Sequence, residues 1–165
     1  MFSYDLNLRK VCRGDLGALL EMKMESQAFH HRIAILNEAD QCAWYEGLDR
    51  DVHQPSELVL IGSDPKRADG CAGDVGVISL RNINYIDGTA DVGCDVFSAH
   101  RGMGFGTRLM SSVISLCREV LRLRKLSCEV LDFNLASRRM VERNGFVEEG
   151  ARRRHVYRNG SFVED

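Results

Sequence analysis

Residues 90–109, ADVGCDVFSAHRGMGFGTRL, constrain the fold and the chemistry of this chain more than any other stretch. A strand-like run over residues 91–97 leads into a basic residue and three alternating glycines, and a helix is predicted to open at Thr107. Glycine backbone at the mouth of a helix can turn several N–H groups toward one anion, because no Cβ blocks the approach and the helix dipole favours negative charge. The stretch therefore predicts a phosphate-binding cradle. Its residues are Arg101, Gly102, Met103, Gly104, Phe105, Gly106 and Thr107.

Two better-known glycine-loop motifs do not fit this stretch. The Walker motif requires a lysine followed by Ser or Thr after its last glycine, but Thr107 and Arg108 follow Gly106. The dinucleotide pattern GxGxxG would begin at Gly104, and Leu109 stands where its third glycine is required. The local alternative is a flexible loop that binds no ligand, so the rest of the chain must decide.

Composition narrows the class of protein. With 165 residues, 44% hydrophobic and 28% charged, the chain is expected to form one globular domain, residues 1–165. The net charge of −2 argues against a nucleic-acid partner. Six cysteines without a CxxC pair or short Cys/His spacing predict buried thiols and no metal site. Because no signal-like N-terminus and no long apolar run is present, we expect a cytoplasmic protein with no membrane partner.

Hydrophobic periodicity predicts an α/β (α+β) chain with a mixed, largely antiparallel sheet flanked by helices on both faces. Strands are predicted over residues 4–11, 57–62, 74–83, 89–97, 125–131 and 146–157. Helices are predicted from Asp15 onward, over residues 38–48, over residues 107–122 and over residues 134–144. Residues 63–73, Asp87-Gly88 and Asn159-Gly160 are expected to be hairpin connections.

The second half of the chain carries an ordered motif series. A predicted strand ends before Asn134, a helix follows, and Asn144-Gly145-Phe146 leads into the next strand. Together with the Arg-x-x-Gly-x-Gly cradle, this series resembles the GNAT superfamily of acetyl-CoA-dependent N-acetyltransferases. The resemblance spans residues 74–165. The ending and the Trp44-Tyr45-Glu46 segment look most similar to the branch of ribosomal-protein N-terminal and nucleotide-amino-sugar acetyltransferases.

The resemblance implies a binding site for acetyl-CoA. The cofactor pyrophosphate would rest on the cradle N–H groups. The strands over residues 89–97 and 125–131 would splay, so that the backbone of Val96, Phe97 and Ser98 pairs with the pantetheine arm. The N–H of Val96 or Phe97 is expected to polarise the thioester carbonyl. Asn134 matches the family residue that contacts the pantetheine arm, and a plain helix N-cap is an equally compatible role.

The resemblance also suggests catalytic residues. Glu129 stands five residues before Asn134, where some ribosomal-protein-type members place a general base; its alternative is a solvated strand glutamate. Many members carry a tyrosine as proton donor where this chain has Val141. This departure shifts the acid role to Ser137, whose alternatives are an ordinary helix residue or a contact to CoA. Reserve bases are Asp91, Asp95 and His155.

The expected acceptor is a primary amine of a small molecule such as an amino sugar, with a protein N-terminus as the alternative. Because the usual tyrosine is missing, a non-catalytic acyl-CoA-binding module is a hypothesis of another class, and a nucleotide-binding protein unrelated to CoA is a third. Relatives usually continue past the Asn159-Gly160 hairpin with a complete last strand. We therefore expect a truncated last strand, whose exposed edge promotes a homodimer.

Overall fold

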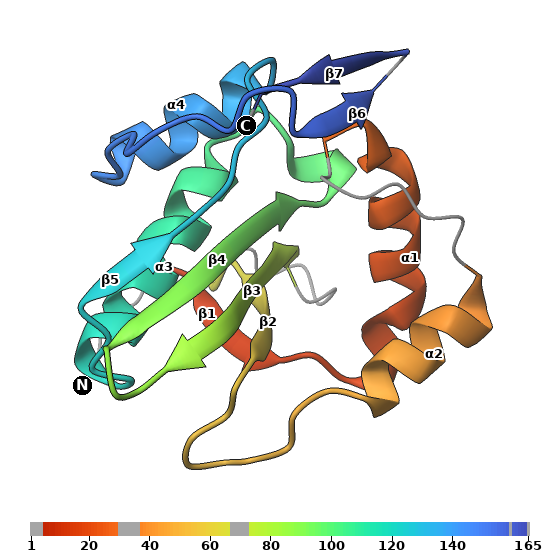
Figure 1. Cartoon of the computed structure of the whole chain (residues 1–165). Helices are drawn as coiled ribbons and strands as arrows, with labels where there is room; N and C mark the ends of the chain where they lie inside the picture. Colours follow the sequence, from red (N-terminus) through yellow and green to blue (C-terminus); the bar gives the residue numbers. More distant parts are fainter. Residues whose placement is uncertain (1–4, 30–36, 67–72, 159, 165) are drawn as a thin grey trace.

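The computed structural model describes residues 5–29, 37–66, 73–158 and 160–164. A five-stranded sheet in the order β1-β2-β3-β4-β5 forms its centre (Figure 1). The first three pairings are antiparallel and the β4–β5 pairing is parallel. The strands are β1 (Asn7–Lys10), β2 (Leu58–Ser63), β3 (Asp74–Asn84), β4 (Thr89–Val96) and β5 (Lys125–Ser127).

Helices cover both faces of this sheet, as the sequence predicts. Figure 1 shows α1 and α2 on the side away from α3 and α4. A separate antiparallel hairpin of β6 and β7 lies near the end of the chain. The helices are α1 (Leu16–Glu25), α2 (Glu38–Glu46), α3 (Phe105–Glu119) and α4 (Leu135–Arg143); the short 3-10 turns are η1 (Arg13–Asp15), η2 (Gln27–Phe29) and η3 (Ser98–His100); the hairpin strands are β6 (Val156–Arg158) and β7 (Ser161–Val163). None of the helices in the described ranges is long and apolar enough to cross a bilayer.

The sheet separates two hydrophobic cores, and a bulge in β3 places two nearby valines of this strand in different cores. Gly62 pairs with Gly76 and Ser63 with Asp74, so Val75 is an extra residue in the ladder. Val75 is fully buried in the core on the α3 side, whereas Val77, two residues on, belongs to the core on the α1 side. Without the bulge, the two-residue period of a strand would place both valines on one face.

Several predicted elements have other bounds in the structure. The strand predicted over residues 125–131 ends at Ser127, because β5 is the edge of the sheet and no described strand pairs with its outer side. The strand predicted over residues 146–157 is irregular until Val156. Helix α3 begins at Phe105 and not at Thr107, because Gly104 already serves as its N-cap. Tyr4, residues 67–72 of the predicted loop and Asn159 lie outside the described residues.

At Gly76, β3 and β4 lie too close together to leave room for a side chain. A Cβ there would overlap the Asp95 carbonyl oxygen and lie 3.0 Å from the Val96 Cα. We expect Gly76→Ala to lower the free energy of unfolding by about 2–3 kcal/mol, since overpacking against backbone has no easy relief. Chemical denaturation measures the change. Gly17→Ala, whose Cβ would meet nothing within 4 Å in α1, should instead stabilise by about 0.5–1 kcal/mol; equal stability of both variants would contradict the close-approach argument.

Candidate functional site

The carboxyl end of β4 has an open edge. Pairing between β4 and β5 stops at Asp91 and Ser127, so the predicted splayed strand pair is present. Pairing with β3 continues on the other side, where the Phe97 N–H donates to the Val75 carbonyl at 3.0 Å. Because backbone groups alternate along a strand, the Val96 N–H and C=O point toward the open edge. The Phe97 N–H is therefore committed to β3, and of the two predicted carbonyl-polarising donors Val96 has the suitable direction.

The predicted cradle follows this edge directly. Gly102 and Gly104 adopt φ of 75° and 82°, in the left-handed region that glycine tolerates best. Gly104 caps α3 without a side-chain hydrogen bond, so the N–H groups of Phe105, Gly106 and Thr107 have no acceptor within the helix. A Cβ at Gly102 or Gly104 would meet nothing within 4 Å, so these positions border open space. Backbone donors and the positive end of a 15-residue helix dipole thus converge where an anion could sit.

Arg101 lies between the strand edge and the cradle. Its Nε donates to the Val96 carbonyl at 3.1 Å, and its Nη2 is 3.9 Å from Glu25 Oε2 at the end of α1. The side chain therefore ties the cradle to β4. Ser98 opens the intervening turn, where its carbonyl accepts from the Arg101 N–H at 3.3 Å.

Helix α4 joins the cradle through a glycine. A Cβ at Gly106 would lie 2.9 Å from the Met140 Sδ and 3.5 Å from the Val96 Cγ2, so α3, α4 and β4 meet closely here and a side chain would require Met140 to shift. The same helix carries Asn134 and Ser137 at its start. Asn134 Oδ1 accepts from the Ser137 N–H at 3.2 Å, which confirms the N-cap. The cap uses the oxygen, so the amide nitrogen of Asn134 is the atom suited to a ligand carbonyl.

Glu129 lies apart from this group. It faces a groove of about 730 Å³ on the outer side of β5, which residues of the cradle do not line. Its side chain is 55% exposed and forms an ion pair with Arg152 from the opposite wall. A second ion pair, Lys125 to Glu149 at 2.9 Å, crosses the same groove. Described contacts do not bring Glu129 and Ser137 together, and both catalytic roles stay predictions.

Sequence reasoning did not predict the cation that lies on the α1 side of β4. Lys23 of α1 places its Nζ 4.2 Å from the Trp44 ring centroid and donates to Gln41 Oε1 at 3.2 Å. Burial lowers the pKa of Lys23, and the Asp95 carboxylate partly offsets this. Asp95 pairs with Val77, whose side chain faces α1. Only the tertiary packing of α1, α2 and β4 creates this group, so no local motif reveals it.

A comparison with known families decides what this arrangement is. The model of the acetyltransferase (GNAT) domain matches residues 5–147, which include β4, the cradle and α4. The chain belongs to the GNAT acetyltransferase family. The expectations of an acetyl-CoA-dependent acetyltransferase and of a GNAT fold are thereby confirmed at the level of the family. Among the described residues, no group of three His, Cys, Asp or Glu side chains could hold a metal ion.

Relatives of this GNAT chain include several N-acetyltransferases. It is 24% identical over 163 residues to the spermidine N(1)-acetyltransferase of Vibrio cholerae, covering 96% of this chain and 88% of that protein. It is 35% identical over 93 residues to the probable N-acetyltransferase YjcK of Bacillus subtilis, covering 54% and 50%. Its alignment to the N-acetyltransferase YoaA of Bacillus subtilis likewise spans 49% of that protein, about half its length.

The fold matches a solved structure over nearly its whole length. The crystal structure of spermidine N-acetyltransferase from Vibrio cholerae, in complex with CoA and spermine, superposes with a TM-score of 0.83 at 23% identity. The match covers 97% of this chain and 91% of that one. This likeness establishes the fold of the GNAT chain.

Gly104→Val tests the cradle. The added side chain points into open space bordered by the uncapped N–H groups, so we expect CoA binding to be lost, and the positive φ adds strain of about 1–2 kcal/mol. Titration calorimetry with CoA measures the binding. Gly160→Val is the matched control, because Gly160 also has a positive φ and a Cβ that would meet nothing within 4 Å, but it lies in the β6–β7 turn, outside the cradle. Wild-type affinity in Gly104→Val would contradict a cofactor site at this loop.

Proposed function

We propose that this protein transfers an acetyl group from acetyl-CoA to a primary amine of a small molecule by direct attack. One observation carries the proposal: the first N–H groups of α3, which no side chain caps, lie next to the edge of β4 from which β5 has separated. Two glycines with positive φ lead from that edge to the helix. An anion-binding helix end beside a strand edge that no other described strand pairs with suits a ligand with a pyrophosphate and an amide-bearing arm. Acetyl-CoA has both.

The proposed chemistry distributes three roles over the chain. Acetyl-CoA supplies the acetyl thioester. The Val96 N–H is directed to donate a hydrogen bond to the carbonyl that is attacked. Glu129 accepts the proton of the amine, directly or through water, and Ser137 donates a proton to the departing thiolate. Val141 cannot donate a proton, so the acid role depends on Ser137 or on solvent.

The acceptor is proposed from similarity over nearly the whole chain. A protein named spermidine N(1)-acetyltransferase aligns with 96% of it, which favours a small cationic amine such as a polyamine. Asp91 and Asp95 share one face of β4 on either side of Gly93, and their carboxylates would attract such a cation. An amino sugar and a protein N-terminus are the competing acceptors.

Thiol release from acetyl-CoA distinguishes these functions. Spermidine, glucosamine and a peptide with an unblocked N-terminus are each tested as acceptors at a series of concentrations. Thiol release is measured with the purified protein and acetyl-CoA. Turnover that is fastest with spermidine or glucosamine supports the proposal. Preference for the peptide points to a protein acceptor. CoA binding without turnover on any amine points to a non-catalytic acyl-CoA module, and ATP binding without CoA binding points to an unrelated nucleotide-binding protein.

Glu129→Gln tests the base. We expect kcat to fall by about tenfold or more, since a positioned general base contributes at least that much, while CoA affinity stays within about twofold. Steady-state kinetics and calorimetry give the two quantities. Glu149→Gln is the control, because Glu149 is exposed in the same groove and also forms an ion pair across it. Unchanged turnover in Glu129→Gln would remove Glu129 as the base.

We also propose that two copies associate through the outer edge of β5. The groove beside this edge is lined by β5 and by residues 128–131 and 146–150. Strand β5 pairs only with β4, and the other two segments form no strand in the described structure. An unpaired edge of this kind favours pairing with another chain. Sedimentation equilibrium over a wide concentration range should show a dimer, and a monomer at every concentration would contradict the association.

A further inference from the structure

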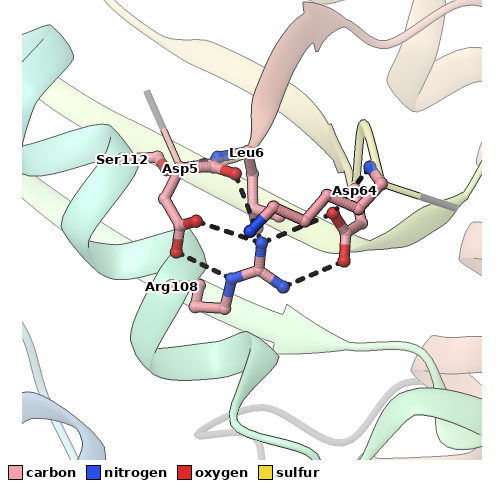
Figure 2. Close-up of polar contacts among 6 residues, drawn as sticks. Asp5, Leu6, Asp64, Arg108 and Ser112 are labelled. Atoms are coloured by element: carbon pink, nitrogen blue, oxygen red, sulfur yellow. Dashed lines mark hydrogen bonds and ion pairs between the residues drawn. The ribbon is translucent and has the colours of Figure 1, made fainter. Parts of the chain in front are cut away.

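Arg108, in the first turns of α3, is saturated by protein carboxylates. Its Nε and Nη2 donate to Asp5 Oδ2 and Oδ1 at 2.7 and 3.0 Å, and its Nη1 donates to Asp64 Oδ2 at 3.0 Å. Figure 2 shows the guanidinium held between the two carboxylates. With every nitrogen engaged, Arg108 is an anchor of the helix and not a direct phosphate ligand.

The anchor is fixed to the sheet at two points. Asp64 directly follows β2 and is only 8% exposed, and Asp5 lies just before β1. Hydrogen bonds from Arg108 hold the pKa of both carboxyls below their usual range, so both stay ionised at neutral pH. One helical turn further, the Leu6 N–H donates to the buried Ser112 Oγ at 3.2 Å (Figure 2). The Arg108 bonds thus attach the start of α3 to the edge of the sheet, and Ser112 makes a separate contact with the sheet farther along the helix.

A ring stack extends this attachment into the cradle. The Arg108 Cζ lies 5.1 Å from the centroid of Phe105, which is buried at the first position of α3. Phe105 in turn meets the His100 ring edge-on, with centroids 5.7 Å apart and planes at 69°. His100 and Phe105 are the residues on either side of the exposed loop Arg101–Gly104. The stack therefore fixes both ends of a loop that Arg101 also ties to β4.

We infer that Arg108, Phe105 and His100 are positioning residues that hold the cradle in its anion-binding shape and so set the affinity for acetyl-CoA. The inference rests on the proposed use of acetyl-CoA by this site. Backbone N–H groups bind an anion well only when they already point to one place before the anion arrives. A loop with two glycines can leave that arrangement at a small cost in free energy, because glycine adopts many backbone conformations. The stack acts through loop geometry, so it should influence cofactor binding and leave the chemical step alone.

Arg108→Ala tests the inference against Ser112→Ala, which removes a buried contact of the same helix one turn away. Arg108→Ala should raise the Kd for CoA by about fivefold or more, because ordering the loop then opposes binding, while kcat at saturating acetyl-CoA changes less than about twofold. Ser112→Ala should lower the Tm and leave the Kd within about twofold. Arg108→Lys, which keeps the charge but not the fork, should give an intermediate Kd.

Hydrogen exchange provides a readout that needs no cofactor. Amides of residues 101–104 should exchange faster in Arg108→Ala and at the wild-type rate in Ser112→Ala. Unchanged exchange and Kd in Arg108→Ala, or equal changes in both variants, would overturn the inference. If Arg108→Ala does not fold, His100→Ala tests the inference instead, because His100 is the end of the stack next to the loop. The same two quantities are measured: the Kd for CoA and the exchange rates of amides 101–104. Failure of the wild type to bind CoA would instead contradict the proposed function.

Discussion

The parting of β4 from β5 after three residue pairs determines where this protein can bind a ligand. Parallel strands that stay paired leave no backbone for a third partner, whereas here β4 runs on to Val96 with only β3 beside it. The hydrogen bond from the Phe97 N–H to the Val75 carbonyl keeps the end of β4 beside β3, and the missing side chain at Gly76 lets the two strands approach. The cradle and α4 are then placed by the end of β4. A ligand site at this end is a consequence of strand geometry before any side chain is considered.

Much of this arrangement follows from sequence. The alternating glycines, the Asp87-Gly88 hairpin and Asn134 with Gly145 predicted the loop, the β3–β4 pair and the bounds of α4, because turns and caps depend on local backbone preferences. The strands predicted over residues 125–131 and 146–157 failed for the opposite reason. Their alternation is local, but a strand exists only where another strand pairs with it, and sequence alone does not reveal which neighbour is present. The groups around Arg108 and Lys23 join segments up to 103 residues apart and were invisible for the same reason.

Charge near the cradle is arranged unusually for an anion site. Arg101 donates to a carbonyl and lies near Glu25, and Arg108 is bound by two aspartates. Both arginines of the site are thus occupied with protein groups. Recognition of an anion then depends on oriented N–H groups and the helix dipole, which select shape as well as charge. Such a site should discriminate a pyrophosphate from a simple salt ion better than a cluster of arginines would.

The bulge at Val75 has an evolutionary consequence. Upstream of it, the connection between β2 and β3 can change length without altering which way β3 faces, since loops absorb insertions. Downstream, adding or deleting one residue would exchange the two cores and turn Asp95 away from α1. Between Val75 and Val96 natural selection must therefore preserve the number of residues, and at Gly76 also the absence of a side chain. Homologous chains should keep the arms of this hairpin at a constant length while their composition varies at positions other than Gly76.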